Sequence, residues 1–156
     1  QTIDFSKGRE RSIVAKRATE KSIKYEKEIY EKISKIYHKF DSSVTVEKQL
    51  TYQIHGDNPG KNEKRSDIGI INREKKHIIF IDLFYPSNTS TLGGCVRIKR
   101  KKLRDNPVIV KNYTYEIYFV CMNPKFKQEE IDNLTIKTDG YLILSIDTFN
   151  KKFMLE

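Results

Sequence analysis

The chain contains little cysteine, and this scarcity excludes two classes of small protein. Its two cysteines, Cys95 and Cys121, lie in dissimilar surroundings and at no spacing typical of paired ligands. A disulfide framework and a cysteine-based zinc site are therefore both excluded. A reducing intracellular compartment is the expected location, which means the cytoplasm or nucleoid, or the nucleus in a eukaryote.

Long apolar runs are also missing. The longest uninterrupted ones, such as residues 117–122, are far shorter than the roughly 20 residues that a membrane-spanning helix needs. No signal peptide is visible, and no membrane partner is expected. Because the first residue is Gln1 and not Met, we expect a chain that has been trimmed or cut from a larger one.

Several familiar catalytic patterns are absent as well. The three histidines, His38, His55 and His77, share no metal-ligand spacing. No Ser-His-Asp arrangement, phosphate-binding loop or dinucleotide-binding glycine pattern occurs. The tyrosines and phenylalanines lie mostly at core spacing, which predicts packing and not a base-stacking surface.

Positive charge, in contrast, is abundant. Lys and Arg number 30 against 21 Asp and Glu, which gives a net charge of +9. Such an excess suits a polyanionic partner, nucleic acid first and an anionic membrane second. A biased genome is the alternative explanation for a chain rich in Lys, Ile and Asn. With 156 residues, the chain has room for a single domain, residues 1–156.

Two periodicities follow each other in the first part of the chain. Over residues 9–40, apolar side chains recur at steps of three and four, which predicts one long helix with an apolar face. Residues 44–54 alternate between apolar and polar, as a half-buried strand does. Residues 55–66 carry glycine, proline and many charges, which indicates a basic loop.

The rest of the chain predicts further strands and helices. Two runs rich in Ile and Phe flank the polar stretch 73–76, and they predict a hairpin of central strands at 67–72 and 77–85. A turn at 86–94, a helix at 95–105, a strand at 113–122, a helix at 126–134, a strand at 141–146 and a helix capped by Asp147 follow. This order predicts an α/β sandwich with a mixed sheet, an αβββαβ core at about 44–147 preceded by the long helix and flanked by helices.

The hairpin suggests a metal site. If Asn72 pairs with His77, then Asp67 and Asp82 face each other on one side of the sheet, with Cβ atoms about 5 Å apart. Two carboxylates that close repel each other, and a divalent cation such as Mg²⁺ between them removes that cost. The alternative is that loop amides satisfy each aspartate separately. A slip of one residue in the register would also move one aspartate to the other face.

A strongly basic segment follows the hairpin, with six cations in the eight positions 97–104. It predicts a helix that packs beside the second hairpin strand, so that Lys99 or a neighbour can reach the aspartates. The other cations favour contact with a phosphate backbone. Together with the basic loop, the residues expected to bind nucleic acid are Lys61, Lys64, Arg65, Arg97, Arg100, Lys101, Lys102 and Arg104.

A third carboxylate would complete a metal site. Glu26 lies about 60° from the centre of the apolar face of the long helix, at the edge of the buried side. Glu47, on the first strand, is the rival candidate. For either residue, the alternative is an ordinary surface glutamate paired with a lysine.

The segments RSDIGI at 65–70 and IFIDLFYP at 79–86 carry a family resemblance. The long helix, the hairpin with Asp67 and Asp82, and the basic helix after it resemble the PD-(D/E)XK restriction-like nuclease superfamily. Within it, the chain looks most like the restriction-like endonuclease domains of site-specific non-LTR retrotransposons. Those domains place Asp-x-x-x-Pro on the second strand and the lysine on the next helix, where Lys99 matches by spacing. The strand at 113–122 and residues 141–147 are also similar to the cleavage domains of type IIS restriction enzymes.

The resemblance implies a restriction-endonuclease-like fold and a Mg²⁺- or Mn²⁺-dependent DNA endonuclease. Asp67, Asp82, Lys99 and Glu26 would be its catalytic residues, and Asp67 and Asp82 would hold the metal. A homodimer would allow double-strand cleavage. Two departures occur: Ser66 replaces the usual proline, and Phe84 replaces the usual lysine. The second leaves open an inactive nuclease fold that only binds nucleic acid, and an RNA-directed nuclease is a further alternative.

Overall fold

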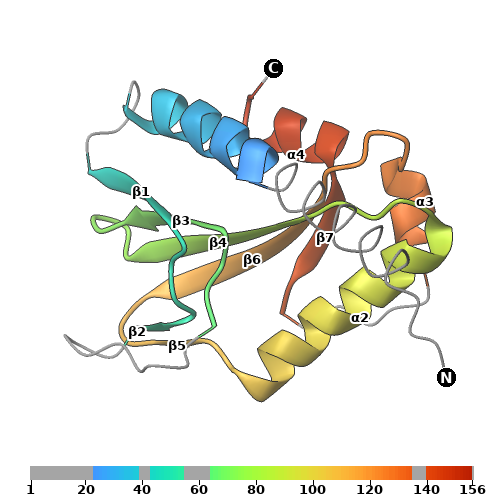
Figure 1. The fold of residues 1–156 in the computed structure, drawn as a ribbon. Helices are drawn as coiled ribbons and strands as arrows, with labels where there is room; N and C mark the ends of the chain where they lie inside the picture. Colours follow the sequence, from blue (N-terminus) through green and yellow to red (C-terminus); the bar gives the residue numbers. More distant parts are fainter. Residues whose placement is uncertain (1–22, 39–42, 55–63, 135–139, 156) are drawn as a thin grey trace, which may run out of the picture.

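The computed structural model describes residues 23–38, 43–54, 64–134 and 140–155. A five-stranded mixed sheet with the order β1-β3-β4-β6-β7 forms its centre, and helices lie on both faces (Figure 1). The long helix predicted at 9–40 is helical over the described residues 23–38, and the rest of that range lies outside the described residues. Within the described ranges, none of the helices has the length and apolar character that crossing a bilayer requires.

One half of the sheet is an antiparallel meander. It consists of β1 (Val44–Lys48), β3 (Ile68–Asn72) and β4 (His77–Phe84). Asn72 pairs with His77 and Ile68 with Ile81, so the predicted hairpin register is confirmed. Both strands are central in the sheet and largely buried, which explains their nearly continuous apolar sequences.

The other half of the sheet is parallel. After β4, helix α2 (Thr89–Asp105) leads to β6 (Thr114–Cys121), which pairs with β4 in parallel. The short helix α3 (Gln128–Asp132) connects β6 to β7 (Leu142–Ser145), and α4 (Ile146–Lys152) follows. The order of helix, three strands, helix and strand confirms the predicted αβββαβ core and its α/β sandwich.

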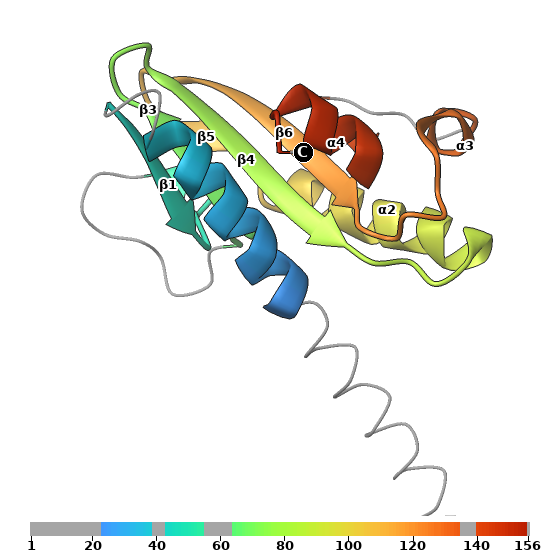
Figure 2. The ribbon, with the colours of Figure 1, turned by 90° about the horizontal axis from the view of Figure 1, so that it is seen from above.

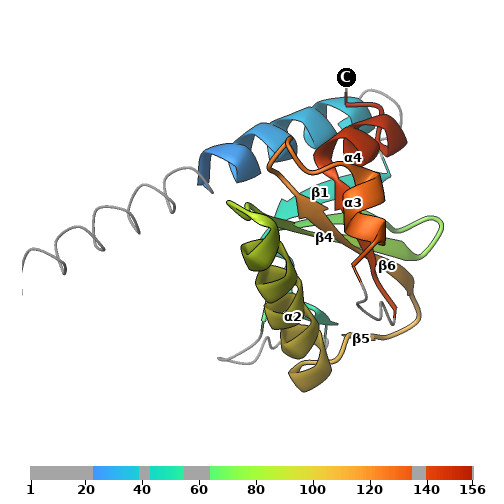
Figure 3. The same cartoon turned by 90° about the vertical axis from the view of Figure 1, so that its right-hand side faces the viewer.

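Two apolar layers hold the helices against the sheet. Helix 23–38 and α4 cover one face, through a cluster that includes Ile29, Ile33 and Phe149. Viewed from above, the two helices lie over the same face of the sheet (Figure 2). Helix α2 covers the opposite face through Leu92 and Val96 (Figure 3).

The strand predicted at 44–54 is interrupted. β1 ends at Lys48, Gln49 adopts a left-handed backbone with φ 54°, and β2 (Gln53–Ile54) belongs to a second sheet. β2 pairs in parallel with β5 (Ile109–Val110), a strand that periodicity did not predict. The chain turns inward at Leu50, which packs so closely on Gly69 that a Cβ at this glycine would collide with the leucine side chain.

Two helix starts also differ from the prediction. The turn predicted at 86–94 is wrong, because α2 already begins at Thr89. The Asn88 side chain accepts from the Thr91 N–H and the Thr91 hydroxyl accepts from the Asn88 N–H, a capping box that outweighs the two glycines in the first turns. At α4, Ser145 is the cap and not Asp147, which instead pairs with Lys127.

Candidate metal and phosphodiester site

Asp67 and Asp82 meet where the hairpin strands end. Continuing the register of β3 and β4 by one residue places them opposite each other. The Asp67 N–H donates to Asp82 Oδ1 at 3.1 Å, and the Leu83 N–H donates to Asp67 Oδ2 at 2.7 Å. Asp82 is completely buried, whereas Asp67 is half-buried. The two carboxylates are therefore adjacent, but only Asp67 has partial access to solvent.

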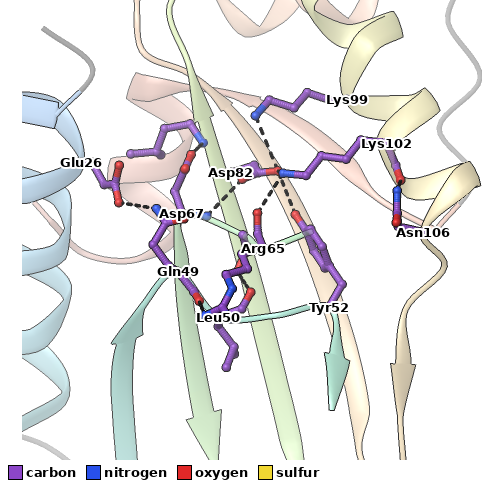
Figure 4. A network of polar contacts seen from close by, with 12 residues as sticks. Glu26, Gln49, Leu50, Tyr52, Arg65, Asp67, Asp82, Lys99, Lys102 and Asn106 are labelled. Atoms are coloured by element: carbon purple, nitrogen blue, oxygen red, sulfur yellow. Dashed lines mark hydrogen bonds and ion pairs between the residues drawn. The ribbon is translucent and has the colours of Figure 1, made fainter. Parts of the chain in front are cut away.

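Three donors converge on the other oxygen of Asp82. The Tyr52 hydroxyl donates to Oδ2 at 2.8 Å, and the ammonium of Lys102 lies 3.3 Å from it (Figure 4). The Lys99 ammonium lies 3.6 Å from the same oxygen. Both lysines reach the same oxygen from α2, because residues three apart lie on the same side of a helix. This surrounding polar shell explains how a charged group can occupy a fully buried position.

The negative charge of Asp67 is less well compensated by neighbouring groups than that of Asp82. Burial and the neighbouring Asp82 raise the pKa of Asp67 to about 6, and Glu26 contributes in the same direction. The Leu83 N–H and Lys99 oppose this shift in the Asp67 pKa, but they do not cancel it. At neutral pH, Asp67 is therefore a carboxylate whose charge the fold leaves partly uncompensated, which is the state that attracts a cation.

A small cavity opens beside Asp67. Its volume is about 100 Å³, and its charged lining residues are Glu26, Asp67 and Lys99; the others are Tyr25, Leu83, Phe84, Tyr85 and Met122. Because a water molecule occupies about 30 Å³ of liquid volume, the cavity has room for a few waters or a hydrated ion. It is smaller than the several hundred Å³ that drug-sized ligands occupy.

The structure places the two candidate glutamates differently. Glu26 faces the cavity from helix 23–38 and accepts a 2.8 Å hydrogen bond from Gln49 Nε2. The Gln49 N–H also donates to the Asp67 carbonyl at 2.9 Å, so one residue ties Glu26 to the segment that carries Asp67. Glu47 is exposed on β1 opposite Gly69 and does not line this cavity.

The six cations of α2 fall into two groups. Lys99 and Lys102 are half-buried and directed at Asp82. The exposed group is Arg97, Arg100, Lys101 and Arg104. Lys102 was predicted to contact nucleic acid, but its ammonium is engaged by Asp82 and by the Arg65 carbonyl at 2.8 Å. Lys64 and Arg65 are exposed nearby, and Lys61 lies outside the described residues.

Two residues of this site were missed by the sequence analysis. Tyr52, assigned to packing, is in the core but also carries the shortest hydrogen bond to Asp82. Gln49, within a predicted strand, instead forms the turn that reaches Glu26. Neither position has a signal in the sequence, because both depend on the chain leaving β1 at Gln49. Phe84, at the usual lysine position, is buried and apolar, so the cations at this site come from α2.

The oxygen ligands are of the type that Mg²⁺ and Mn²⁺ prefer. Among the described residues, no group of three or more His, Cys, Asp or Glu is arranged to hold a metal ion. Mg²⁺, however, usually keeps several waters and binds through one or two carboxylates. Asp67, which lines a cavity that admits waters and whose charge is left partly uncompensated, meets that requirement. Asp82 is adjacent to Asp67 but is buried and does not line the cavity.

Comparisons with known proteins give one match. No family model matches the chain, and no curated protein matches it in sequence. Among solved structures, the chain is similar to MunI restriction endonuclease in complex with cognate DNA. The match has 11% sequence identity and a TM-score of 0.42, and it covers 77% of this chain and 81% of that chain.

Proposed function

We propose that this protein is a metal-dependent DNA endonuclease that hydrolyses phosphodiester bonds. One observation carries the proposal: two adjacent carboxylates, Asp67 and Asp82, share a site with Lys99 beside a cavity that has room for a few waters. In such a reaction, water adds to phosphorus, one P–O ester bond breaks, and a phosphate monoester and a hydroxyl end are formed. The site offers groups for each requirement of that chemistry.

Asp67 and Asp82 would hold Mg²⁺ or Mn²⁺. When bound, such an ion lowers the pKa of water and neutralises charge on the phosphate. Glu26 faces the same cavity and is the third carboxylate of the proposed site. Because the Asp67 pKa is raised to about 6, protons compete with a cation for this carboxylate below that pH.

Lys99 is the lysine that lines the cavity and would contact the reacting phosphate. Its ammonium is ion-paired with Asp82 at 3.6 Å, and its side chain lines the cavity beside Asp67. From this position it would orient the attacking water or donate to a non-bridging phosphate oxygen as charge accumulates there. The placement on the helix after the hairpin, with Phe84 in the strand, is the arrangement expected for the restriction-like endonuclease domains of non-LTR retrotransposons.

The exposed face of α2 would bind the DNA backbone. Arg97, Arg100, Lys101 and Arg104 are all exposed on the helix that carries Lys99. Lys64 and Arg65 would extend the basic surface from the neighbouring segment. Cutting both strands would require a second active site, which a homodimer would supply.

A second candidate function is nucleic-acid binding without cleavage. It is favoured by Asp82, because Tyr52, Lys99 and Lys102 already surround its buried carboxylate. The basic surface would serve such a module equally well.

Cleavage of supercoiled plasmid DNA separates the two functions. With Mg²⁺ or Mn²⁺, the wild type should nick or linearise the plasmid, and EDTA should stop it. Asp82→Asn keeps the side-chain shape but removes the charge, so it should abolish cleavage while leaving DNA affinity nearly intact. A purified wild type that binds DNA but never cuts would favour the binding module. Cleavage by Asp82→Asn at the wild-type rate would overturn the site assignment.

A further inference from the structure

Tyr52 is a fixed hydrogen-bond donor to Asp82. Its side chain is completely buried, and its hydroxyl lies 2.8 Å from Asp82 Oδ2. Burial and the Asp82 charge raise the pKa of Tyr52 far above its ordinary value of 10.

Hydrogen bonds hold the backbone of Tyr52, and an aromatic contact holds its ring. Its N–H donates to the Lys64 carbonyl at 3.2 Å, and its carbonyl accepts from the Ile109 N–H at 3.0 Å. The ring packs on Phe80 with centroids 4.9 Å apart. The pairing beside the small β2·β5 sheet thus holds the backbone of Tyr52 in place. From this position its hydroxyl donates to Asp82 and restrains the orientation of that carboxylate.

Lys102 is held just as firmly. Its ammonium contacts Asp82 Oδ2 at 3.3 Å and the Arg65 carbonyl at 2.8 Å. It also lies 5.4 Å from the centroid of the Tyr52 ring. Lys99, in contrast, has a single ion-pair partner among the described residues, at the longer distance of 3.6 Å.

We propose that Tyr52 and Lys102 are positioning residues that jointly fix Asp82, so that its Oδ1 stays directed to the Asp67 side of the site. Oδ2 accepts from Tyr52 and Lys102, while Oδ1 accepts only from the Asp67 N–H among the described residues. Of the two lysines at Asp82, Lys99 is the less restrained, because its ion pair is longer than that of Lys102. The inference rests on the proposed function, because it assigns the way in which Asp82 is prepared to hold a divalent cation.

Mn²⁺ affinity, measured by calorimetry on the protein without DNA, is the primary test. Tyr52→Phe removes one hydroxyl and keeps the ring. Residues that orient a metal ligand typically contribute 10- to 100-fold in metal affinity, so we expect Tyr52→Phe to weaken Mn²⁺ binding by about tenfold. The single-turnover cleavage rate should fall as well, while DNA affinity stays unchanged.

The chain provides a matched control. Tyr118 is also buried, its hydroxyl donates to Glu116 at 3.0 Å, and Lys152 lies 5.4 Å from its ring centroid. Tyr118→Phe therefore makes the same chemical change in a similar Lys-Tyr-carboxylate arrangement away from the site. Because Glu116 is about half exposed, Tyr118→Phe should lower stability less than Tyr52→Phe does, and it should not change Mn²⁺ affinity.

A double-mutant cycle tests whether the two residues act together. Because Tyr52 and Lys102 act through the same oxygen, the effects of Tyr52→Phe and Lys102→Met on Mn²⁺ affinity should be non-additive. The effects of Tyr52→Phe and Lys152→Met should be additive.

The outcomes are distinguishable. If the wild type binds Mn²⁺ and cleaves DNA but Tyr52→Phe matches it in both, or if the Tyr52–Lys102 cycle is additive, the positioning role is wrong and the proposed function stands. A loss of thermal stability in Tyr52→Phe with unchanged Mn²⁺ affinity would likewise mean that Tyr52 is only structural. If the wild type neither binds Mn²⁺ nor cleaves DNA, the proposed function is wrong, and the positioning role is wrong with it.

Discussion

A buried carboxylate costs several kcal/mol of folding free energy unless polar groups surround it. Asp82 meets this condition with donors from three separate segments, namely Tyr52, the Asp67 N–H and the lysines of α2. Asp67 meets it only in part, which explains why its pKa is raised to about 6. Of the two aspartates, the one that lines the cavity is thus also the one whose charge the fold compensates less.

This imbalance predicts a stabilising substitution. The pKa of Asp67 rises from 3.8 in the unfolded chain to about 6 in the fold, so the folded state binds more protons between these values. The free energy of unfolding of the metal-free protein should therefore fall as the pH rises from 4 to 6. Asp67→Asn removes the charge and should raise this free energy by about 1–3 kcal/mol at pH 7, with little gain at pH 4.

Urea unfolding in EDTA at both pH values measures this effect. Mn²⁺ should stabilise the wild type by binding the folded state, and it should stabilise Asp67→Asn much less. A variant less stable than the wild type at pH 7 would show that the Asp67 charge is compensated in the fold.

The geometry of the site also predicts how a substitution of Lys99 should change the cleavage rate. Lys99→Ala removes the ammonium that lines the cavity, so the single-turnover rate at saturating protein should fall on the order of 100-fold, with DNA affinity nearly unchanged. Lys101→Ala, on the exposed side of the same helix, should instead weaken DNA binding. Equal cleavage rates for Lys99→Ala and the wild type would place the catalytic cation elsewhere.

At the scale of elements, the hairpin could be predicted from its sequence and α2 only in part. The pairing of Asp67 with Asp82 follows from two apolar strands and the turn of four residues between them. Because both strands are apolar on both faces, the turn and not the burial pattern sets the register. The sequence placed Lys99 or a neighbour within reach of the aspartates, and the family resemblance singled out Lys99 by its spacing; in the structure both Lys99 and Lys102 reach Asp82. The start of α2 was missed because Gly93 and Gly94 suggested a turn, whereas the Asn88 capping box fixes the helix start locally.

The proposed DNA contact along the exposed face of α2 predicts how DNA affinity should depend on salt. Its four exposed cations and Lys64 would neutralise about five phosphates, so log K should fall against log salt with a slope of about −4 to −5. Removing one of them, as in Lys101→Ala, should make the slope shallower by about one unit. Fluorescence anisotropy on a short duplex measures both values. A slope near zero for the wild type would mean that this helix face does not bind phosphates.

At the scale of the whole molecule, the layers of the sandwich could be predicted but the second sheet could not. Alternation between helical and strand periodicity is visible in short windows of sequence. β2 and β5, in contrast, are two residues each and pair across more than 50 residues of chain. Tyr52 reaches Asp82 only because of that pairing and the left-handed Gln49. One of the donors to Asp82 is therefore set by contacts that no local pattern encodes.

The order in which the sheet can assemble follows from its connections. The two aspartates lie 15 residues apart within one hairpin, whereas the lysines arrive only when α2 docks. Because closing a short loop costs less entropy than closing a long one, the negative charges should meet before the positive charges that offset them. The repulsion between Asp67 and Asp82 should then raise the free-energy barrier to folding. Stopped-flow refolding should slow as the pH rises from 4 to 7 in the wild type, and Asp67→Asn should refold at a rate that hardly depends on pH.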